Sequence, residues 1–484
     1  MGVVLKQSLK NTLVTYLGFG IGALNILFLY TNFLTDEYFG LVGVILSTAT
    51  ILMPLMAFGV PNTLVKYYSS FQGSKNSNGF LTLMLLLPLV IIIPSTVLTY
   101  FAFEAIGKFL SKENAIVESY VWYIFLIGLA MGYFEVFYAW ARVQMKTVFG
   151  NFMKEVFIRV CVTLLLCLVY FKVITVEVFL KALVVVYLLR TIIMKLYAYK
   201  LKFPKLSFTF PKNSKEIITF SSLIILGASA GVIVLEIDRF MINQFIKIEY
   251  VAYYSVAIFI ATVIAVPSRA MHQITYPLTA EILNRKDSFA LKELYQKSSL
   301  TLFIISGLLF ILILLNLNDL YTLIPKEYSG GLLVVLLIGL AKLYDSLLGN
   351  NNSILYNSDY YKTVLVMGVC LAAMTVLFNF WLIPLYGLNG AALATFLAIC
   401  IFNTAKLFYV KAKFKIQPFT VDTLKVLGLL LLIGPPLYFL ELPFYALLNI
   451  AIKSVFVVVV YISVLYKFKI SEDVFGVLSK FLKK

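Results

Sequence analysis

The stretch SSLTLFIISGLLFILILLN, residues 298–316, runs for nineteen residues without a charged side chain. A helix needs about 20 predominantly apolar residues to cross the hydrocarbon of a bilayer, so this stretch predicts a transmembrane helix. Comparable runs recur along the chain of 484 residues and predict about fourteen spans. The predicted spans are residues 11–33, 40–61, 80–103, 117–139, 151–171, 175–197, 217–243, 248–270, 298–316, 329–349, 361–382, 388–410, 422–440 and 443–466. The strands of a membrane β-barrel run only about 10 residues. The predicted fold class is therefore all-α, a polytopic helical membrane protein.

The composition leaves too little polar surface for a soluble protein. Hydrophobic residues make up 61% and charged residues 13% of the chain, whereas soluble chains are about half apolar and about a quarter charged. The formal net charge of +17 would suit nucleic acid, but Lys and Arg stand in short clusters between the apolar runs. There they set the membrane topology and meet anionic lipid headgroups, so no nucleic-acid partner is expected.

The distribution of basic residues predicts the orientation of the chain. About 30 of the 40 Lys and Arg fall on one set of connections, which the positive-inside rule places in the cytoplasm. Lys154 and Lys406 are counted among these loop cations, as is the cluster from Lys195 to Lys215. Both termini are then cytoplasmic and the number of spans is even, a condition that fourteen satisfies.

An internal similarity predicts a duplicated architecture. The segment Asn32-Phe-Leu-Thr-Asp-Glu-Tyr-Phe-Gly40 is similar to Gln244-Phe-Ile-Lys-Ile-Glu-Tyr-Val-Ala252, at an offset that covers six predicted spans. We predict two six-helix bundles, residues 1–212 and 213–415. Because six is even, the bundles share one orientation and form a parallel repeat about an axis along the membrane normal. Residues 416–484 are predicted to be two additional transmembrane helices and a cytoplasmic tail.

Three stretches, two of which overlap the segments above, are each similar to a segment of a known exporter superfamily. They occur in this chain in the same order as in that superfamily. The first, Leu34-Thr-Asp-Glu-Tyr-Phe-Gly-Leu41, resembles the loop between its first two helices. The second is Glu236-Ile-Asp-Arg-Phe-Met-Ile-Asn243 with Glu249-Tyr-Val-Ala-Tyr-Tyr-Ser-Val-Ala257, and the third is Asn379-Phe-Trp-Leu-Ile-Pro-Leu-Tyr-Gly-Leu-Asn-Gly-Ala-Ala-Leu-Ala-Thr395. On these residues the chain resembles the polysaccharide biosynthesis or O-antigen flippase family of the multidrug/oligosaccharidyl-lipid/polysaccharide (MOP) exporter superfamily.

The resemblance implies a function in the bacterial inner membrane. Members of this family move an undecaprenyl-diphosphate-linked oligosaccharide, the repeat unit of an O-antigen, capsule or exopolysaccharide, from the cytoplasmic to the outer leaflet by alternating access. The implied partners are this lipid-linked oligosaccharide, membrane lipids and other polysaccharide-assembly proteins.

Other functions stay open on the same sequence. Many O-antigen flippases are described with twelve helices, so fourteen keeps a lipid II flippase as an alternative. A cation-coupled multidrug exporter of the same superfamily is a second alternative. A membrane-bound glycan polymerase or ligase is an alternative of a different class. Such enzymes usually need a large outer loop, whereas the longest connections here are predicted to be cytoplasmic, so no enzymatic activity is expected.

Charged side chains inside the predicted spans are the first candidates for function, because each costs about 2.5–3.5 kcal/mol to insert. Glu135, Glu155, Arg159 and Arg190 lie in the fourth to sixth spans, and Arg142 follows Glu135 by seven residues on the same helical face. A diphosphate needs fixed cations, and the planar guanidinium suits phosphate oxygens. Arg159 and Arg190 are therefore the leading candidates for binding the diphosphate, with Arg142 as a further cavity residue.

A structural role is the alternative for these residues. Glu155 and Arg159 are spaced i,i+4 and would neutralise each other on one helix face. Arg190 lies about two turns from the predicted cytoplasmic end of its span and could extend its guanidinium to the headgroups. Glu135 and Glu155 are also candidates for coupling transport to a H⁺ or Na⁺ gradient.

Three charged residues stand close together in the seventh span, namely Glu236, Asp238 and Arg239. Asp238 is a candidate ion-coupling residue, because a buried carboxylate changes its protonation with access to solvent. Arg239 is a further candidate for the diphosphate cavity. Since Arg239 directly follows Asp238, a structural ion pair between them is the favoured interpretation.

Three polar positions in the second half receive a less specific interpretation. Asp345 is the last ion-coupling candidate, although exposure to solvent near Lys342 would explain its charge. The only histidine, His272, is interpreted as an interface residue. The run Gly349-Asn-Asn-Asn-Ser353 is predicted to be a solvated cytoplasmic turn.

No sequence motif indicates a bound cofactor. The chain lacks a GxxxxGK[ST] phosphate-binding loop, so ATP is not expected to be the direct energy source. The four cysteines form no CxxC or Cys/His cluster for a metal. We expect no cofactor and no metal, with a H⁺ or Na⁺ gradient as the source of energy.

Overall fold

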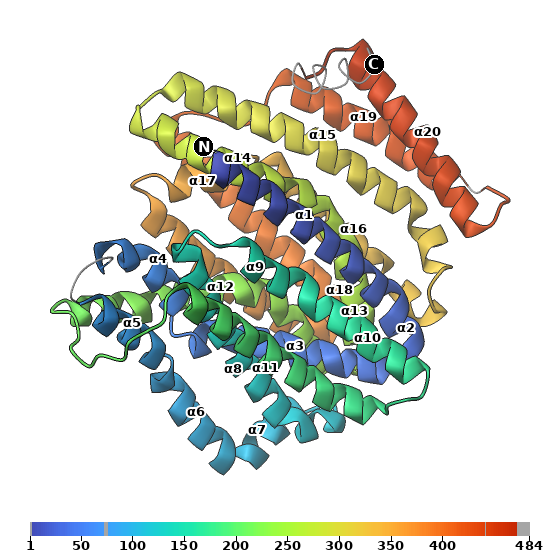
Figure 1. Cartoon of the computed structure of the whole chain (residues 1–484). Helices are drawn as coiled ribbons and strands as arrows, with labels where there is room; N and C mark the ends of the chain where they lie inside the picture. The colour runs from blue at the N-terminus through green and yellow to red at the C-terminus, as the bar shows by residue number, and fades with distance from the viewer. Residues whose placement is uncertain (1, 72–75, 441, 472–484) are drawn as a thin grey trace. The chain divides into compact units, whose positions relative to one another are not determined.

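The computed structural model describes residues 2–71, 76–440 and 442–471. Over these ranges the regular elements are helices, and no β-strand is present (Figure 1). The prediction of an all-α fold is confirmed. The predicted cytoplasmic tail includes residues 472–484, which lie outside the described residues.

The first of two compact units comprises Met1–Ser255. Its elements are α1 (Gly2–Leu24), η1 (Asn25–Leu29), α2 (Tyr30–Phe33), α3 (Asp36–Met56), α4 (Val60–Phe71), α5 (Ser77–Leu86), α6 (Leu89–Phe101), α7 (Phe103–Leu110), η2 (Ala115–Tyr120), α8 (Val121–Val143), α9 (Val148–Phe152), η3 (Met153–Phe157), α10 (Ile158–Tyr170), α11 (Val176–Leu201) and α12 (Ser214–Phe245). Of these, η1 and η3 are π-helical. Within this unit α8 packs against α3, α4 and α11, and α12 packs against α3.

The second unit comprises Val256–Lys484, and α13 (Glu249–Thr262) runs across the boundary. Its further elements are η4 (Val263–Ala265), α14 (Val266–Asn284), α15 (Ser288–Tyr321), η5 (Lys326–Gly331), α16 (Leu332–Leu347), α17 (Asn351–Tyr356), α18 (Tyr361–Phe414), α19 (Val421–Tyr438) and α20 (Ala446–Lys467). The two helices predicted after residue 416 correspond to α19 and α20, which pack against α15.

Eleven helices of the described residues are long and apolar enough to cross a membrane, by length and composition. Among them α18 counts once, although Gly387 (φ 56°, ψ −131°) interrupts its 54 residues between predicted spans 361–382 and 388–410. Predicted spans 151–171 and 175–197 form helices as well, but these are not among the eleven. Every predicted span coincides with helical structure, while the number fourteen stays a prediction.

Hydroxyl and carboxylate side chains cap the N-termini of several of these helices. Thr35 and Thr175 each accept a hydrogen bond from a backbone N–H in the first turn of α3 and α11. Asp287 does the same for α15, and Thr420 forms a capping box at the start of α19. Such caps satisfy backbone donors that the first turn of a helix leaves unpaired. Local sequence therefore fixes where these helices begin.

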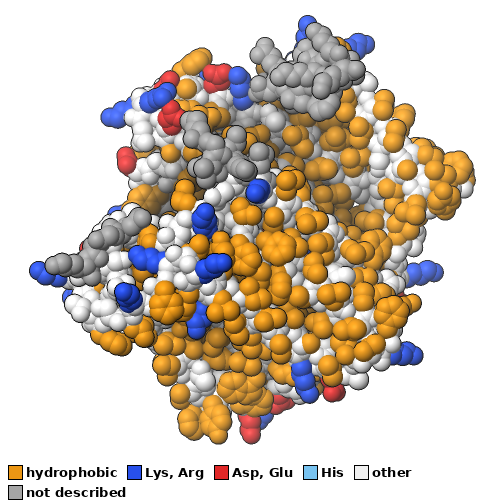
Figure 2. Space-filling model, in the orientation of Figure 1, with side chains coloured by type: hydrophobic (Ala, Val, Ile, Leu, Met, Phe, Trp, Pro, Cys, Tyr) orange, Lys and Arg blue, Asp and Glu red, His pale blue; other side chains and the backbone are white. Residues whose placement is uncertain are grey.

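Apolar side chains cover the outer surface of the first unit. Figure 2 shows hydrophobic side chains over α1, α10 and α11. Leu13, Leu164 and Ile192 on these three helices are 70%, 60% and 53% exposed. Extended apolar surfaces of this kind are rare on soluble proteins, so this face is suited to contact with lipid.

The two similar segments that predicted a duplication lie against each other in the first unit. Gly40 sits at the backbone carbonyl of Ile248, which a Cβ at position 40 would overlap. The hydroxyl of Tyr253 donates to Asp36 Oδ2 at 2.7 Å. The compact units divide at residue 255, because α12 packs with α3 in the first unit. This division into compact units does not test the duplication. The two six-helix bundles with boundaries at residues 212 and 415 stay a prediction.

Replacing Gly40 with Ala is expected to destabilise the protein, because the new methyl group would push α3 away from the Ile248 carbonyl. Overpacking of this kind costs about 1–3 kcal/mol. Thermal unfolding of the detergent-solubilised protein measures the effect. Gly231→Ala is the matched control, because no described atom lies within 4 Å of a Cβ at that position. An unchanged midpoint for Gly40→Ala would contradict the close approach of the two segments.

Candidate functional site

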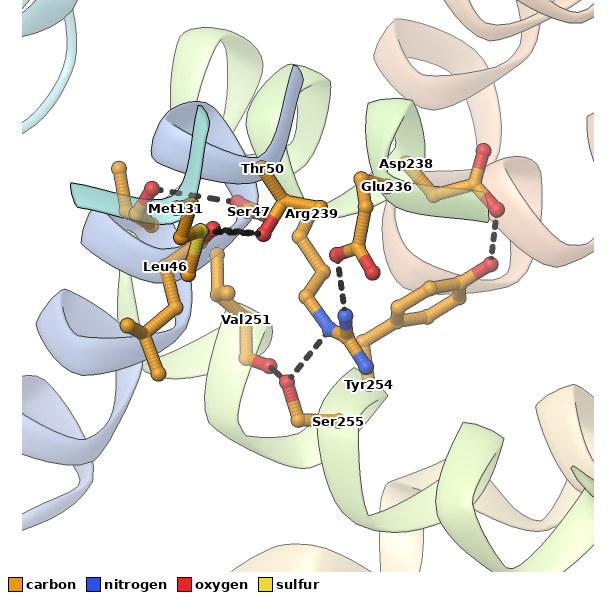
Figure 3. A network of polar contacts seen from close by, with 11 residues as sticks. Leu46, Ser47, Thr50, Met131, Glu236, Asp238, Arg239, Val251, Tyr254 and Ser255 are labelled. Atoms are coloured by element: carbon orange, nitrogen blue, oxygen red, sulfur yellow. Dashed lines mark hydrogen bonds and ion pairs between the residues drawn. The ribbon is translucent and has the colours of Figure 1, made fainter. Parts of the chain in front are cut away.

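The first interior charge group lies on α12 and α13 and is drawn in Figure 3. The guanidinium of Arg239 contacts Glu236 Oε2 at 2.6 Å and donates to Ser255 Oγ at 3.0 Å. Ser255 in turn donates to the carbonyl oxygen of Val251 at 2.7 Å. Glu236 and Arg239 are spaced i,i+3, so their side chains meet on one face of α12.

Asp238 takes part in a different interaction of the same region (Figure 3). Its residue is 2% exposed, and the fully buried Tyr254 donates its hydroxyl to Asp238 Oδ2. The sequence favoured Asp238 as the partner of Arg239, whereas the ion pair of Arg239 is with Glu236. A helix turns about 100° per residue, so Arg239 reaches a carboxylate one turn earlier more readily than its direct neighbour.

A second charge group lies on α8, η3 and α10. Lys154 Nζ contacts Glu135 Oε1 at 2.6 Å, and Arg159 contacts Glu155 Oε2 at 2.7 Å. The mutual neutralisation of Glu155 and Arg159 that their i,i+4 spacing suggested is confirmed. The interpretation of Lys154 as a loop cation missed its pairing with Glu135, because the two residues lie on separate helices. Both of these candidate carboxylates therefore have a cation partner.

Arg159 also lies against the first helices of the chain. Asn25, which is 3% exposed, donates to the backbone carbonyl of Arg159 at 2.9 Å and accepts from the Thr163 hydroxyl at 2.7 Å. A Cβ at Gly18 would come within 2.9 Å of Arg159 Nη1. Asn25 belongs to η1 and Glu155 to η3, and such π-helical turns are frequent at functional sites.

Arg190 on α11 is an interior cation without a carboxylate partner. The residue is 6% exposed, and its guanidinium carbon lies 4.0 Å from the ring centre of Phe134 and 4.9 Å from that of Tyr187. Among the described residues no carboxylate oxygen lies within 4.0 Å of its nitrogens. The Nε of Arg190 is buried and has no hydrogen-bond partner among the described residues. The guanidinium is thus enclosed by aromatic rings rather than extended to the surface.

The two charge groups converge on Tyr187 of α11. This tyrosine lies within electrostatic reach of Arg159, Arg190 and Glu236. Helices α10, α11 and α12 therefore bring three of the charged residues that the sequence singled out to one region of the first unit. Two of the three already form ion pairs, whereas Arg190 forms none with the described residues.

Arg142, the remaining candidate arginine, lies in the last turn of α8. Its guanidinium carbon faces the Tyr138 ring at 4.8 Å, one turn earlier on the same helix. Tyr138 is itself within electrostatic reach of Glu135 and Glu155. Arg142 therefore borders the second charge group.

The second unit contains a buried lysine that the sequence does not single out. Lys406 of α18 is 1% exposed, and its ammonium donates to Asn352 Oδ1 at 2.8 Å and lies 3.9 Å from Asp345 Oδ1. The Asp345 side chain is 40% exposed, in agreement with its expected access to solvent. The interpretation of Lys406 as a loop cation is wrong. Lys406 lies inside the predicted span 388–410, and this position could have indicated its burial.

The asparagine-rich run after α16 is also buried. Asn350, Asn351 and Ser353 are 1%, 1% and 2% exposed, so the predicted solvated turn is wrong. Gly349 adopts a left-handed conformation (φ 54°), which turns the chain back toward the helix ends. The Asn351 amide then donates to the Tyr295 hydroxyl at 2.7 Å. Hydroxyl partners on neighbouring helices make burial of this polar run tolerable.

The fold is shared with solved membrane transporters. A lipid II flippase, MurJ, in an inward closed conformation matches with a TM-score of 0.71 at 15% identity, over 95% of this chain and 99% of that one. Multidrug resistance transporters of the MATE family, MOP superfamily, match in inward-facing and outward-facing conformations with TM-scores of 0.62 and 0.57. Both are 14% identical to this chain. The inward-facing match covers 84% of this chain and 94% of the transporter, and the outward-facing match covers 85% and 96%. The class is therefore a multi-pass membrane protein with the fold of these transporters.

Sequence comparison narrows this class. The family of polysaccharide biosynthesis proteins matches residues 4–283, more than half of the chain. The protein belongs to this family, and the resemblance seen in the sequence is confirmed. No curated protein sequence matches the chain at a significant level.

Replacing Tyr254 with Phe is expected to lower the thermal unfolding midpoint, because Asp238 would lose a hydrogen bond in a buried position. Leaving a buried acceptor without its donor costs about 1–3 kcal/mol. Tyr250→Phe is the matched control, since Tyr250 lies on the same helix and is 40% exposed. Equal midpoints for the two variants would show that the bond to Asp238 contributes nothing to stability.

Proposed function

We propose that the protein is a flippase for an undecaprenyl-diphosphate-linked oligosaccharide, the repeat unit of an O-antigen, capsule or exopolysaccharide. Membership of the polysaccharide biosynthesis family and the transporter fold support this function. The proposed mechanism is alternating access across the bacterial inner membrane, with both termini in the cytoplasm and without a covalent step. The observation that carries the proposal is the buried guanidinium of Arg190, which has no carboxylate partner among the described residues.

An unpaired interior cation is costly and calls for an anion. Arg159 and Arg239 are neutralised by carboxylates at 2.7 and 2.6 Å. The Nε of Arg190 is a buried donor without an acceptor in the described residues, which costs about 1–3 kcal/mol. A diphosphate offers oxygens that match the guanidinium fork. Stacking on Phe134 and Tyr187 would hold this fork in position before the substrate binds.

A cation-coupled drug exporter is the competing function on this fold. A cationic drug would need accessible carboxylates, but Glu135, Glu155 and Glu236 each contact a cation at 2.6 or 2.7 Å, and the buried Asp238 accepts a hydrogen bond from Tyr254. A lipid II flippase is harder to distinguish, because its substrate carries the same undecaprenyl diphosphate, and the likeness to MurJ covers 95% of the chain. The glycan, rather than the diphosphate, separates these two flippases.

We further propose that translocation is coupled to a H⁺ or Na⁺ gradient through Asp238. This carboxylate is 2% exposed and is held by the Tyr254 hydroxyl. Access of solvent from one side of the membrane would exchange this hydrogen bond for a proton or a sodium ion. The proposed partners are the lipid-linked substrate, membrane lipids and other polysaccharide-assembly proteins.

Leaflet translocation in proteoliposomes tests the proposal. Purified protein is supplied with a fluorescent undecaprenyl-diphosphate oligosaccharide, with fluorescent lipid II, or with a cationic dye, each with and without an imposed H⁺ or Na⁺ gradient. Translocation of the oligosaccharide carrier is the expected result. Movement of lipid II alone would assign the other flippase activity, and movement of the dye alone would assign drug export.

Arg190→Gln is expected to lower the translocation rate about 10–100-fold, because a hydrogen bond to a charged group contributes about 1.5–3 kcal/mol. Arg190→Lys keeps the charge but loses the planar fork, so its rate should be intermediate. Arg285→Gln is the control, since this arginine is 72% exposed and paired with Glu281. If folded and inserted Arg190→Gln protein translocated the substrate at the wild-type rate, Arg190 would not belong to the substrate site.

A further inference from the structure

The connection between α11 and α12 is a surface feature that the proposed function does not use. Residues 202–213, here called the linker segment, have no helical or strand structure: Lys202 is a bend, and Lys212 and Asn213 form a turn. Contacts with α5 place the segment beside that helix in the first unit (Figure 1). Its sequence from 203 to 212, FPKLSFTFPK, interleaves aromatic and basic side chains.

The backbone of the linker segment is held in a defined conformation. The N–H of Ser207 donates to Thr82 Oγ1 at 3.0 Å. Gly79 lies so close to the carbonyl of Thr209 that a Cβ at position 79 would overlap it. These contacts fix the inward side of the segment against α5, so its outward side chains have defined positions.

Three large apolar side chains point outward from this fixed backbone. Phe203, Leu206 and Phe208 are 70%, 70% and 72% exposed. The linker segment lies outside every candidate membrane span of the described residues, so the hydrocarbon core does not account for this exposure. Aromatic side chains at the ends of membrane helices are typical of the membrane–water interface. The outward side of the segment is therefore suited to insertion among lipid headgroups.

The charges of the segment select one kind of lipid. Lys205, Lys212 and Lys215 are exposed. Glu216 is the only acidic residue between 202 and 216, and it accepts a hydrogen bond from the Tyr67 hydroxyl at 3.1 Å. Basic residues beside inserted aromatic residues favour an anionic membrane surface. A free phosphate ion would meet the lysines but leave the three apolar side chains exposed.

We propose that the linker segment and the first turn of α12 form a docking site for anionic phospholipid headgroups, with Phe203, Leu206 and Phe208 in the interface and with Lys205, Lys212 and, from α12, Lys215 on the phosphates. This site is independent of the flippase proposal, because none of its residues belongs to the interior charge groups. Bound lipid would stabilise the folded protein, and the gain would rise with the logarithm of lipid concentration above the Kd.

The charge part of the proposal is tested on the full chain in neutral detergent, titrated with phosphatidylglycerol, phosphatidylcholine or inorganic phosphate while the thermal midpoint is recorded. Each Lys near an anionic surface contributes about fivefold in affinity, so the triple variant Lys205→Gln, Lys212→Gln, Lys215→Gln should bind phosphatidylglycerol about a hundredfold more weakly. The matched control is Lys172→Gln, Lys181→Gln, Lys247→Gln, which removes the same charge from exposed positions of the first unit and should behave like the wild type.

Three results of this titration would overturn the proposal. They are unchanged phosphatidylglycerol affinity in the linker triple variant, equal stabilisation by phosphatidylcholine, and equal stabilisation by inorganic phosphate alone. The first result would direct attention to an acidic protein partner for the same lysines. A triple variant that misfolds is recognised by size-exclusion chromatography, and single Lys205→Gln and Lys212→Gln variants, each expected to bind about fivefold more weakly, then replace it.

Insertion of the apolar side chains is tested separately by fluorescence. A Phe208→Trp variant adds a fourth tryptophan to the three of the native chain. Phosphatidylglycerol brominated near the top of its acyl chains should quench the added emission, and the linker triple substitution should reduce that quenching. Added emission that the brominated lipid leaves unchanged would overturn the insertion of this segment.

Discussion

Inside a bilayer no water is available to backbone N–H and C=O groups, so the protein itself must satisfy each of them. This constraint makes the chain helical and decides where its helices can bend. At the junction of α3 and α4, Phe58 and Gly59 have φ of 49° and 64°, and the Ser221 hydroxyl donates to the freed Phe58 carbonyl at 2.6 Å. From the π-helical turn η1, Asn25 donates to the carbonyl of Arg159 on α10. A polar side chain thus connects each of these irregular points to a neighbouring helix.

The same requirement applies to charged side chains inside the protein. A charge inside the protein persists when a partner offsets its desolvation, and Glu155, Glu236 and Glu135 each have such a partner within 2.7 Å. Among the described residues, Arg190 stacks against the faces of two aromatic rings, which stabilise a cation but leave its buried Nε without an acceptor. A stacked guanidinium with a free donor is what the proposed diphosphate site requires before the anion binds.

The spans could be predicted because apolar run length is a local property of the sequence. The Glu155–Arg159 pair was predictable for the same reason, since its spacing lies within one helix. The pairing of Lys406 with Asp345 depends on which helices become neighbours, and no local pattern encodes that. The burial of Asn351 likewise requires a hydroxyl, that of Tyr295, which lies 56 residues away in the sequence.

Helix α13 links the packing of α3 to the buried carboxylate of α12. Consecutive residues of this helix, Tyr253 and Tyr254, donate their hydroxyls to Asp36 and Asp238. Because a helical turn is rigid, α13 cannot follow a movement of α3 without also displacing the Tyr254 hydroxyl from Asp238. Loss of the Tyr254 donor would favour a proton or a sodium ion on this buried carboxylate. One turn of helix thus connects the packing of α3 to the carboxylate that the proposed coupling uses.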